Sequence, residues 1–167
     1  MDREEIITAF KNVLDEFHAQ YNIDSPREDT ISFSWGFTLE GKISQLMGIC
    51  QFWQTYVRIL AVPVDDPIVP KNRTEMLRFL AMVNQDRAAG CFEYDMETGE
   101  IRSRFFVDCD GYATLPPDSV RHTLLLPFQM FQQWGDAIVA VATGASDAAT
   151  AFAAVRPDDG GDEDEDD

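Results

Sequence analysis

The residues best suited to acid–base chemistry lie in one short segment of the sequence. Asp108, Cys109 and Asp110 are consecutive, and His122 follows further along the chain. A small hydrolase would need such groups in a pocket, with shifted pKa values, beside its substrate. Asp110 is followed by Gly111, however, and an Asp-Gly pair is typical of a turn. The segment is therefore predicted to be the loop that ends a strand, and we expect the protein not to be an enzyme.

The cysteines and histidines do not predict a metal site. Cys50, Cys91 and Cys109 are widely spaced and never form a Cys-x-x-Cys pair, so they indicate neither a disulfide framework nor a zinc site. Cys50 and Cys91 fall within strand patterns and are expected to be small buried apolar residues. His18 and His122 are far apart, and the acidic C-terminus lacks the alternating ligands of a calcium loop. We expect no cofactor.

Composition restricts both the architecture and the partners. A chain of 167 residues with 45% apolar content fits a single domain with a substantial core. Its net charge of −17 disfavours binding to nucleic acid or to an anionic membrane. No apolar run approaches the roughly 18 residues that span a bilayer, and the acidic N-terminus is unlike a signal peptide. A cytoplasmic protein is expected, with no nucleic-acid or membrane partner.

Hydrophobic periodicity predicts an α+β domain over residues 1–155. The apolar spacing changes from a helical period to strict alternation at about residue 30, which indicates that strands follow a first helix. The expected elements are a helix from near residue 2 to residue 21, a loop over 22–29, a three-strand meander starting at residue 31 with turns at 40–41 and 54–55, a helix over 73–86, a two-strand hairpin of 91–95 and 101–107, a long helix over 118–142 and a short helix ending at 155.

Two local expectations follow from turn and proline chemistry. If residues 40–41 are the centre of a two-residue turn, Trp35 faces Leu46 and Phe33 faces Gly48. Pro127 lies inside the long helix, so a kink or a break is expected near residues 124–126, because proline lacks a backbone donor and crowds the preceding turn.

The meander has one face of mixed character. The expected register places Ile43, Met47 and Ile49 on the side that the first strand lines with serine and threonine. One interpretation is ordinary scatter of exposed apolar residues, or a register that is wrong. The other is a contact surface for a second subunit or for a partner protein.

The second strand of the hairpin carries two arginines on one face. Arg102 and Arg104 are expected to lie near Glu93, Asp95 and Glu100. A surface charge ladder is one interpretation, and each such pair contributes only a few tenths of a kcal/mol. The alternative is a small basic strip that holds an acidic peptide.

Three short segments carry a family resemblance. In residues 76–84 (MLRFLAMVN), 91–95 (CFEYD) and 98–104 (TGEIRSR) the chain resembles the YbjN family of bacterial proteins, described as sensory transduction regulators. The resemblance covers roughly residues 5–145. It implies a twisted antiparallel sheet covered by helices, as in type III secretion chaperones, and a homodimer that binds other polypeptides without catalytic residues.

Two functional hypotheses follow. The first is a non-enzymatic, protein-binding adaptor or regulator of the YbjN type, whose partner or dimer contacts include Ile43, Met47, Ile49, Arg102 and Arg104. The second is an acidic decoy that imitates nucleic acid and binds basic proteins. It is motivated by the net charge and by the tail over 156–167, which holds eight acidic residues and one basic residue and is predicted to be disordered.

Overall fold

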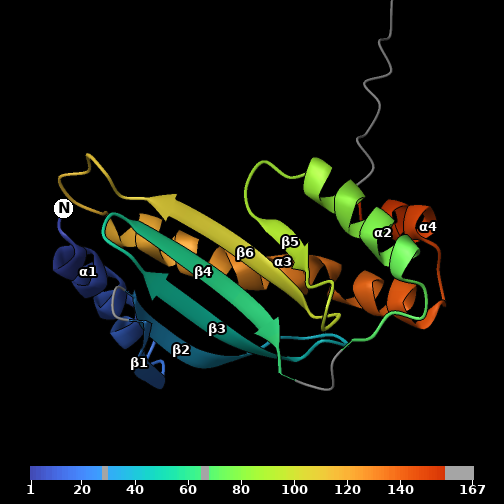
Figure 1. Ribbon diagram of the computed structural model, residues 1–167, viewed down its shortest axis with the longest axis horizontal. Helices are drawn as coiled ribbons and strands as arrows, with labels where there is room; N and C mark the ends of the chain where they lie inside the picture. Colours follow the sequence, from blue (N-terminus) through green and yellow to red (C-terminus); the bar gives the residue numbers. More distant parts are fainter. Residues whose placement is uncertain (28–29, 65–67, 157–167) are drawn as a thin grey trace, which may run out of the picture.

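The computed structural model describes residues 1–27, 30–64 and 68–156 of the chain. Over these residues it has an α+β fold with a six-stranded antiparallel sheet and four helices (Figure 1). In chain order the elements are α1 (Arg3–Glu16), β1 (Tyr21–Arg27), β2 (Thr30–Thr38), β3 (Gln45–Phe52), β4 (Tyr56–Pro63), α2 (Arg73–Gln85), β5 (Cys91–Tyr94), β6 (Ile101–Asp108), α3 (Pro117–Thr143) and α4 (Ala148–Val155). The expected fold class is confirmed.

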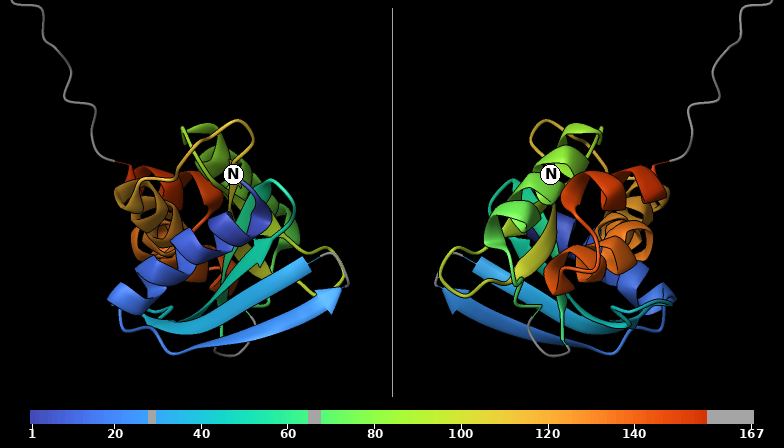
Figure 2. Two further views of the ribbon diagram at one scale, coloured as in Figure 1. Left: turned by 90° about the vertical axis from the view of Figure 1, so that its left-hand side faces the viewer. Right: turned by 90° about the vertical axis from the view of Figure 1, so that its right-hand side faces the viewer.

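The helices gather on one side of a curved sheet whose strand order is β1-β2-β3-β4-β6-β5 (Figure 2). The meander and the hairpin therefore form one sheet, joined where β4 pairs with β6. Helix α3 lies along the covered face, where the Phe128 ring is 4.4 Å from the ring of Phe37 and 5.9 Å from that of Trp35. We call the sheet surface opposite the helices the outer face.

The first helix begins where the sequence predicts and ends earlier. Asp2 accepts a hydrogen bond from the Glu5 backbone N–H at 2.9 Å, and the Glu5 side chain accepts one from the Asp2 N–H at 2.8 Å. This capping box satisfies donors that a helix N-terminus leaves free. The helix ends at Glu16 rather than near residue 21, and Tyr21 instead pairs with Trp35 as the first residue of β1.

The loop expected over residues 22–29 is wrong for its described part. Residues 21–27 form β1, an edge strand paired with β2. Its sequence is mostly polar and contains Pro26, which an edge strand tolerates because one side of its backbone has no ladder partner. Pairing with β2 thus outweighs the low strand propensity of these residues.

The register between β2 and β3 differs from the expected one by two residues. Trp35 lies opposite Gly48, and Phe33 lies opposite Cys50. The connection is longer than a two-residue turn, since the Leu39 N–H donates to the Ser44 carbonyl at 2.8 Å. A shift of two residues keeps every side chain on its expected face, because the side-chain period of a strand is two.

Helix α3 continues through Pro127, so the expected break is wrong. Its apolar face is buried along most of its length, and the carbonyl of Pro127 accepts a hydrogen bond from the buried Ser103 hydroxyl at 2.8 Å. This packing against β6 holds the helix on the sheet on both sides of the proline. Among the described helices, α3 included, none combines the length and apolar character needed to cross a membrane.

Asn84, in the last turn of α2, closes the free edge of β5. Its side-chain Nδ2 donates to the Phe92 carbonyl at 2.9 Å, and its Oδ1 accepts from the Phe92 N–H at 2.7 Å. The amide thus takes the place of a neighbouring strand at the centre of an edge that would otherwise offer unpaired backbone groups. This contact also ties α2 to the hairpin.

Asn84→Ala is expected to lower the free energy of unfolding by about 1–3 kcal/mol, because it leaves a partly buried N–H and a carbonyl without partners. Urea unfolding followed by circular dichroism measures the change. The matched control is Gln85→Ala, an exposed neighbour on the same helix, for which a change within about 0.5 kcal/mol is expected. Equal effects of the two substitutions would show that the Asn84 bridge does not stabilise the fold.

Candidate functional site

The structure places the acid–base candidates in a turn, as predicted. The Asp108 carboxylate accepts a hydrogen bond from the Asp110 N–H at 2.9 Å, and the buried Cys109 donates its N–H to the Thr55 carbonyl at 2.6 Å. His122 is exposed on α3, and no hydrogen bond or ion pair of the described residues joins it to either aspartate. Nor does that part of the chain bring three metal-ligating side chains together.

The three cysteines differ in exposure. Cys50 is fully buried, as expected, and burial raises the pKa of its thiol well above the usual value. Burial, together with the nearby Asp108 carboxylate, also raises the pKa of Cys109. Cys91 is only partly buried, contrary to expectation, because it lies on the outer face, opposite Arg104 in the adjacent strand. It is therefore the most accessible thiol.

Four of the five predicted contact residues share the outer face. Met47 and Ile49 reach it from β3, and Arg102 and Arg104 reach it from β6. Ile43 does not: it precedes β3, is only 4% exposed and packs against Gly135 of α3. The expected placement of Ile43 is wrong because its loop folds toward α3, where the Lys42 N–H donates to Asp136 at 2.7 Å.

The centre of the outer face is apolar. Met47 pairs across the sheet with Val62, and Ile49 pairs with Leu60. Val62 and Leu60 are almost fully buried by their neighbours although no described helix covers them, whereas Met47 is 39% exposed. Phe106, further along this face on β6, is 52% exposed. An apolar strip thus reaches solvent on the side of the sheet that the helices leave open.

The expected charge ladder on the outer face is partly confirmed. Glu93 receives both arginines, with nitrogen–oxygen distances of 2.8 Å to Arg102 and 2.8 Å to Arg104, and Glu100 lies 3.7 Å from Arg102. Asp95 forms no ion pair with either arginine among the described residues. Its carboxylate accepts the backbone N–H groups of the following turn, and these hydrogen bonds, that of Thr98 above all, lower its pKa, while the charge of Arg102 contributes to the same shift.

Arg58 of β4 is a third arginine on this face, and the sequence did not identify it. Its guanidinium donates to the neutral Oε1 of Gln51, at 2.9 Å from Nε, and lies 5.1 Å from the centre of the Trp53 ring. It forms no ion pair within the described part of the chain. Burial lowers the pKa of Arg58, with Glu93 opposing and the two other arginines adding to this shift, but an arginine stays charged at neutral pH.

Arg58 and Arg104 line a cavity of about 380 Å³ with three aromatic residues, and we call it the arginine–aromatic pocket. The Trp53 ring stacks on that of Tyr56 at 4.8 Å, and Tyr56 lies 5.2 Å from Phe106. The pocket depends on the pairing of β4 with β6, which brings Arg58 beside Phe106. The alternating pattern of β4 is visible in the sequence, but that pairing is not.

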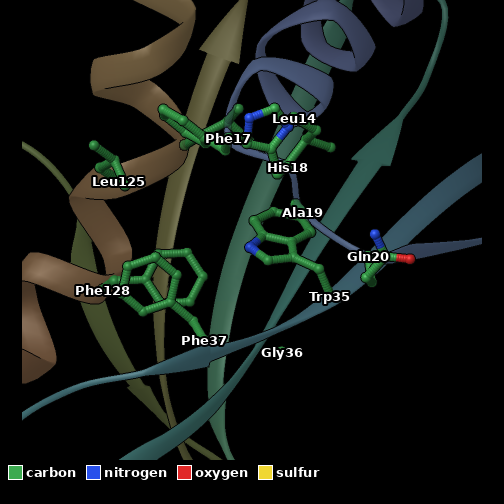
Figure 3. A pocket seen from close by; sticks show the side chains of 11 residues that line it. Leu14, Phe17, His18, Ala19, Gln20, Trp35, Gly36, Phe37, Leu125 and Phe128 are labelled. Atoms are coloured by element: carbon green, nitrogen blue, oxygen red, sulfur yellow. The ribbon is translucent and has the colours of Figure 1, made fainter.

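A second concavity, of about 600 Å³, lies on the helix side (Figure 3). We call it the apolar groove. It opens between the C-terminal end of α1, strand β2 and helix α3, and Figure 3 shows the rings of Phe37 and Phe128 side by side in its wall. His18 has a left-handed backbone with φ 54° there, which follows from the helix end, since its N–H donates to Asp15 and that of Ala19 donates to Leu14. The lining residues are Leu14, Phe17, His18, Ala19, Gln20, Trp35, Gly36, Phe37, Leu124, Leu125 and Phe128.

Comparison of the chain with protein-family models, with curated proteins and with solved structures gives no match. The resemblance to the YbjN family therefore stays a prediction. The candidate site rests on the geometry of the outer face, which combines exposed apolar side chains with arginines.

Proposed function

We propose that this protein is a non-enzymatic protein-binding module, an adaptor or regulator that holds a segment of a partner polypeptide on its outer face. The observation that carries the proposal is the gathering of exposed apolar residues and arginines on the one side of the sheet that the helices leave open. Aromatic residues, methionine and arginine are the types enriched at protein interfaces, and Lys, Glu and Asp are depleted there. The outer face carries Met47, Phe106 and three arginines, the enriched types, although Glu93 and Glu100 lie beside the arginines.

The proposed occupant is a different polypeptide rather than a second copy of this chain. In a two-fold dimer the same patch of each subunit meets its counterpart. Burying the outer face in this way would bring together two patches of the same net positive charge, each containing Arg58 and Arg104, and opposed like charges destabilise an interface. A homodimer, which the family resemblance implies, would then form through another surface.

The test compares two substitutions at side chains of similar exposure. Met47→Asp alters the outer face, and Leu77→Asp alters the exposed side of α2, where Leu77 is 37% exposed and Met47 is 39% exposed. Each protein captures partners from host lysate at low and at moderate salt, and mass spectrometry measures how much of each partner stays bound. We expect Met47→Asp to lower the captured amount of a defined set of partner proteins at least tenfold. Leu77→Asp should leave that amount unchanged.

Phe106→Ser provides a second outer-face variant in case Met47→Asp unfolds the sheet, which circular dichroism would reveal. Equal capture by the outer-face variants and by Leu77→Asp would contradict the proposal. Capture of basic proteins alone, lost at moderate salt and unaffected by any of the substitutions, would instead support the acidic decoy, because screening weakens exposed charge pairs first.

A further inference from the structure

We infer that the arginine–aromatic pocket recognises a carboxylate side chain of the partner, so that the partner segment is acidic and carries an apolar side chain beside its acidic one. This inference rests on the proposed function and assigns the chemistry of its partner. It makes Arg58 the residue that contacts the carboxylate, and Arg104 also lines the pocket.

The local charge has the opposite sign to that of the whole chain. The charged groups that act on Arg58 are Arg102, Arg104 and Glu93. With Glu93 and Glu100, the carboxylates that pair with Arg102 and Arg104, the three arginines give a local charge of 3 − 2 = +1, in a chain whose net charge is −17. Glu93 is already shared by Arg102 and Arg104, so Arg58 is, of these three arginines, the one without an ion pair among the described residues. A partly buried, unpaired cation is a favourable place for an anion.

The geometry of Arg58 leaves donors for such an anion. A guanidinium has five N–H donors in a planar fork. Gln51 accepts from Nε and Nη2 of Arg58, which leaves Nη1 and the second N–H of Nη2. These two nitrogens form the edge of the fork that binds a carboxylate through two parallel hydrogen bonds. Stacking on Trp53 and the hydrogen bonds to Gln51 hold this edge in place before a ligand arrives.

The aromatic walls require an apolar neighbour in the partner segment. Phe106 is half exposed at the rim of the pocket, and Met47 lies exposed on the same face. An apolar side chain next to the bound carboxylate would cover Phe106 and exclude water from the ion pair, which strengthens it.

The experiment measures binding of a fluorescein-labelled peptide of alternating glutamate and leucine to the full-length protein by fluorescence anisotropy. In a second peptide every glutamate is replaced with glutamine, and in a third every leucine is replaced with serine. We expect the glutamate–leucine peptide to bind at least tenfold more tightly than either, and Arg58→Gln to remove most of that difference. Arg58→Lys keeps the charge and loses the fork, so an intermediate affinity is expected. Arg78→Gln, on α2 with a side chain that is 62% exposed, is the matched control and should bind normally.

Cys91 gives a second readout that is independent of the label. It lies beside Arg104 on the outer face, whereas Cys50 and Cys109 are buried with raised pKa values. The bound glutamate–leucine peptide is expected to slow the alkylation of Cys91 by iodoacetamide at least several-fold. The glutamate–serine peptide is expected to leave the alkylation rate unchanged. Thermal unfolding of each variant shows whether it is folded.

The outcomes separate this inference from the proposed function. Equal binding of the glutamate and glutamine peptides, or undiminished binding by a folded Arg58→Gln, would overturn the assignment of a carboxylate. If partner capture still depends on Met47 in that case, the outer face remains a binding surface, but for a partner segment that it does not recognise through a carboxylate. If capture is independent of Met47 as well, both proposals fail. A mass of twice 18.9 kDa by light scattering, reduced to 18.9 kDa by Met47→Asp, would show that a second copy covers this face and would overturn the inference.

Discussion

Trp134→Ala is expected to lower the free energy of unfolding by about 3–5 kcal/mol, the range for truncating a large buried aromatic residue. Trp134 is 1% exposed on α3. Its ring stacks on Phe152 of α4 at 5.5 Å and meets the edge of Phe79 of α2 at 6.0 Å. The indole therefore joins three helices, and the cavity left by alanine would loosen all three. Urea unfolding followed by circular dichroism measures the loss.

Trp134→Phe is the matched control. The indole Nε1 is buried and has no hydrogen-bond partner among the described residues, and a buried donor without a partner is unfavourable. Phenylalanine keeps most of the aromatic contact and removes this donor, so a loss below about 1.5 kcal/mol is expected, as for other conservative core substitutions. A loss for Trp134→Ala as small as that for Trp134→Phe would show that the three helices do not depend on this ring.

The sequence predicts the elements whose signals are local. The start of α1 near residue 2, the alternation of β2 and the end of α3 near residue 142 depend on neighbouring residues, and the structure confirms each. The edge strand β1 was missed because its polar residues become a strand only through pairing with β2. A kink or a break was expected at Pro127 from the chemistry of proline alone. The helix stays continuous because it packs on the sheet, a tertiary effect that the local sequence does not show.

The candidate site was predicted in outline. Met47, Ile49, Arg102 and Arg104 were identified because face assignment depends only on odd or even position along a strand, and the register error of two residues preserved it. Arg58 was missed because its significance depends on the pairing of β4 with β6, which segments far apart in the sequence supply. Whether the predicted residues bind a partner stays a prediction.

Gly48→Ala is expected to lower the free energy of unfolding by about 2–3 kcal/mol, which is the upper end of the range for overpacking a core. A Cβ on Gly48 would lie 2.5 Å from Cε2 of Trp35 and 2.7 Å from Cζ of Phe128. Both rings are buried between the sheet and α3, so neither moves aside without disturbing that layer. Chemical unfolding of the purified variant measures the loss.

Gly36→Ala is the control for Gly48→Ala. Gly36 lies on the adjacent strand, β2, where a Cβ would meet no atom within 4 Å. Alanine there is expected to be neutral or stabilising by up to about 1 kcal/mol, because it restricts the unfolded chain. Replacing Trp35 with leucine should remove part of the loss caused by Gly48→Ala, and a double-mutant cycle measures this coupling. Additive effects of the two substitutions would contradict the clash.

The Gly48 substitution also tests how the fold supports the proposed site. Met47 and Ile49 flank Gly48 on β3, with their side chains on the outer face. If the alanine side chain pushes β3 away from Trp35, these two residues move with the strand, although neither is altered. Gly48→Ala should then weaken binding of the glutamate–leucine peptide under conditions where the variant is folded, whereas Gln85→Ala on α2 should not. Unchanged binding by a folded Gly48→Ala variant would show that the outer face does not depend on the packing beneath it.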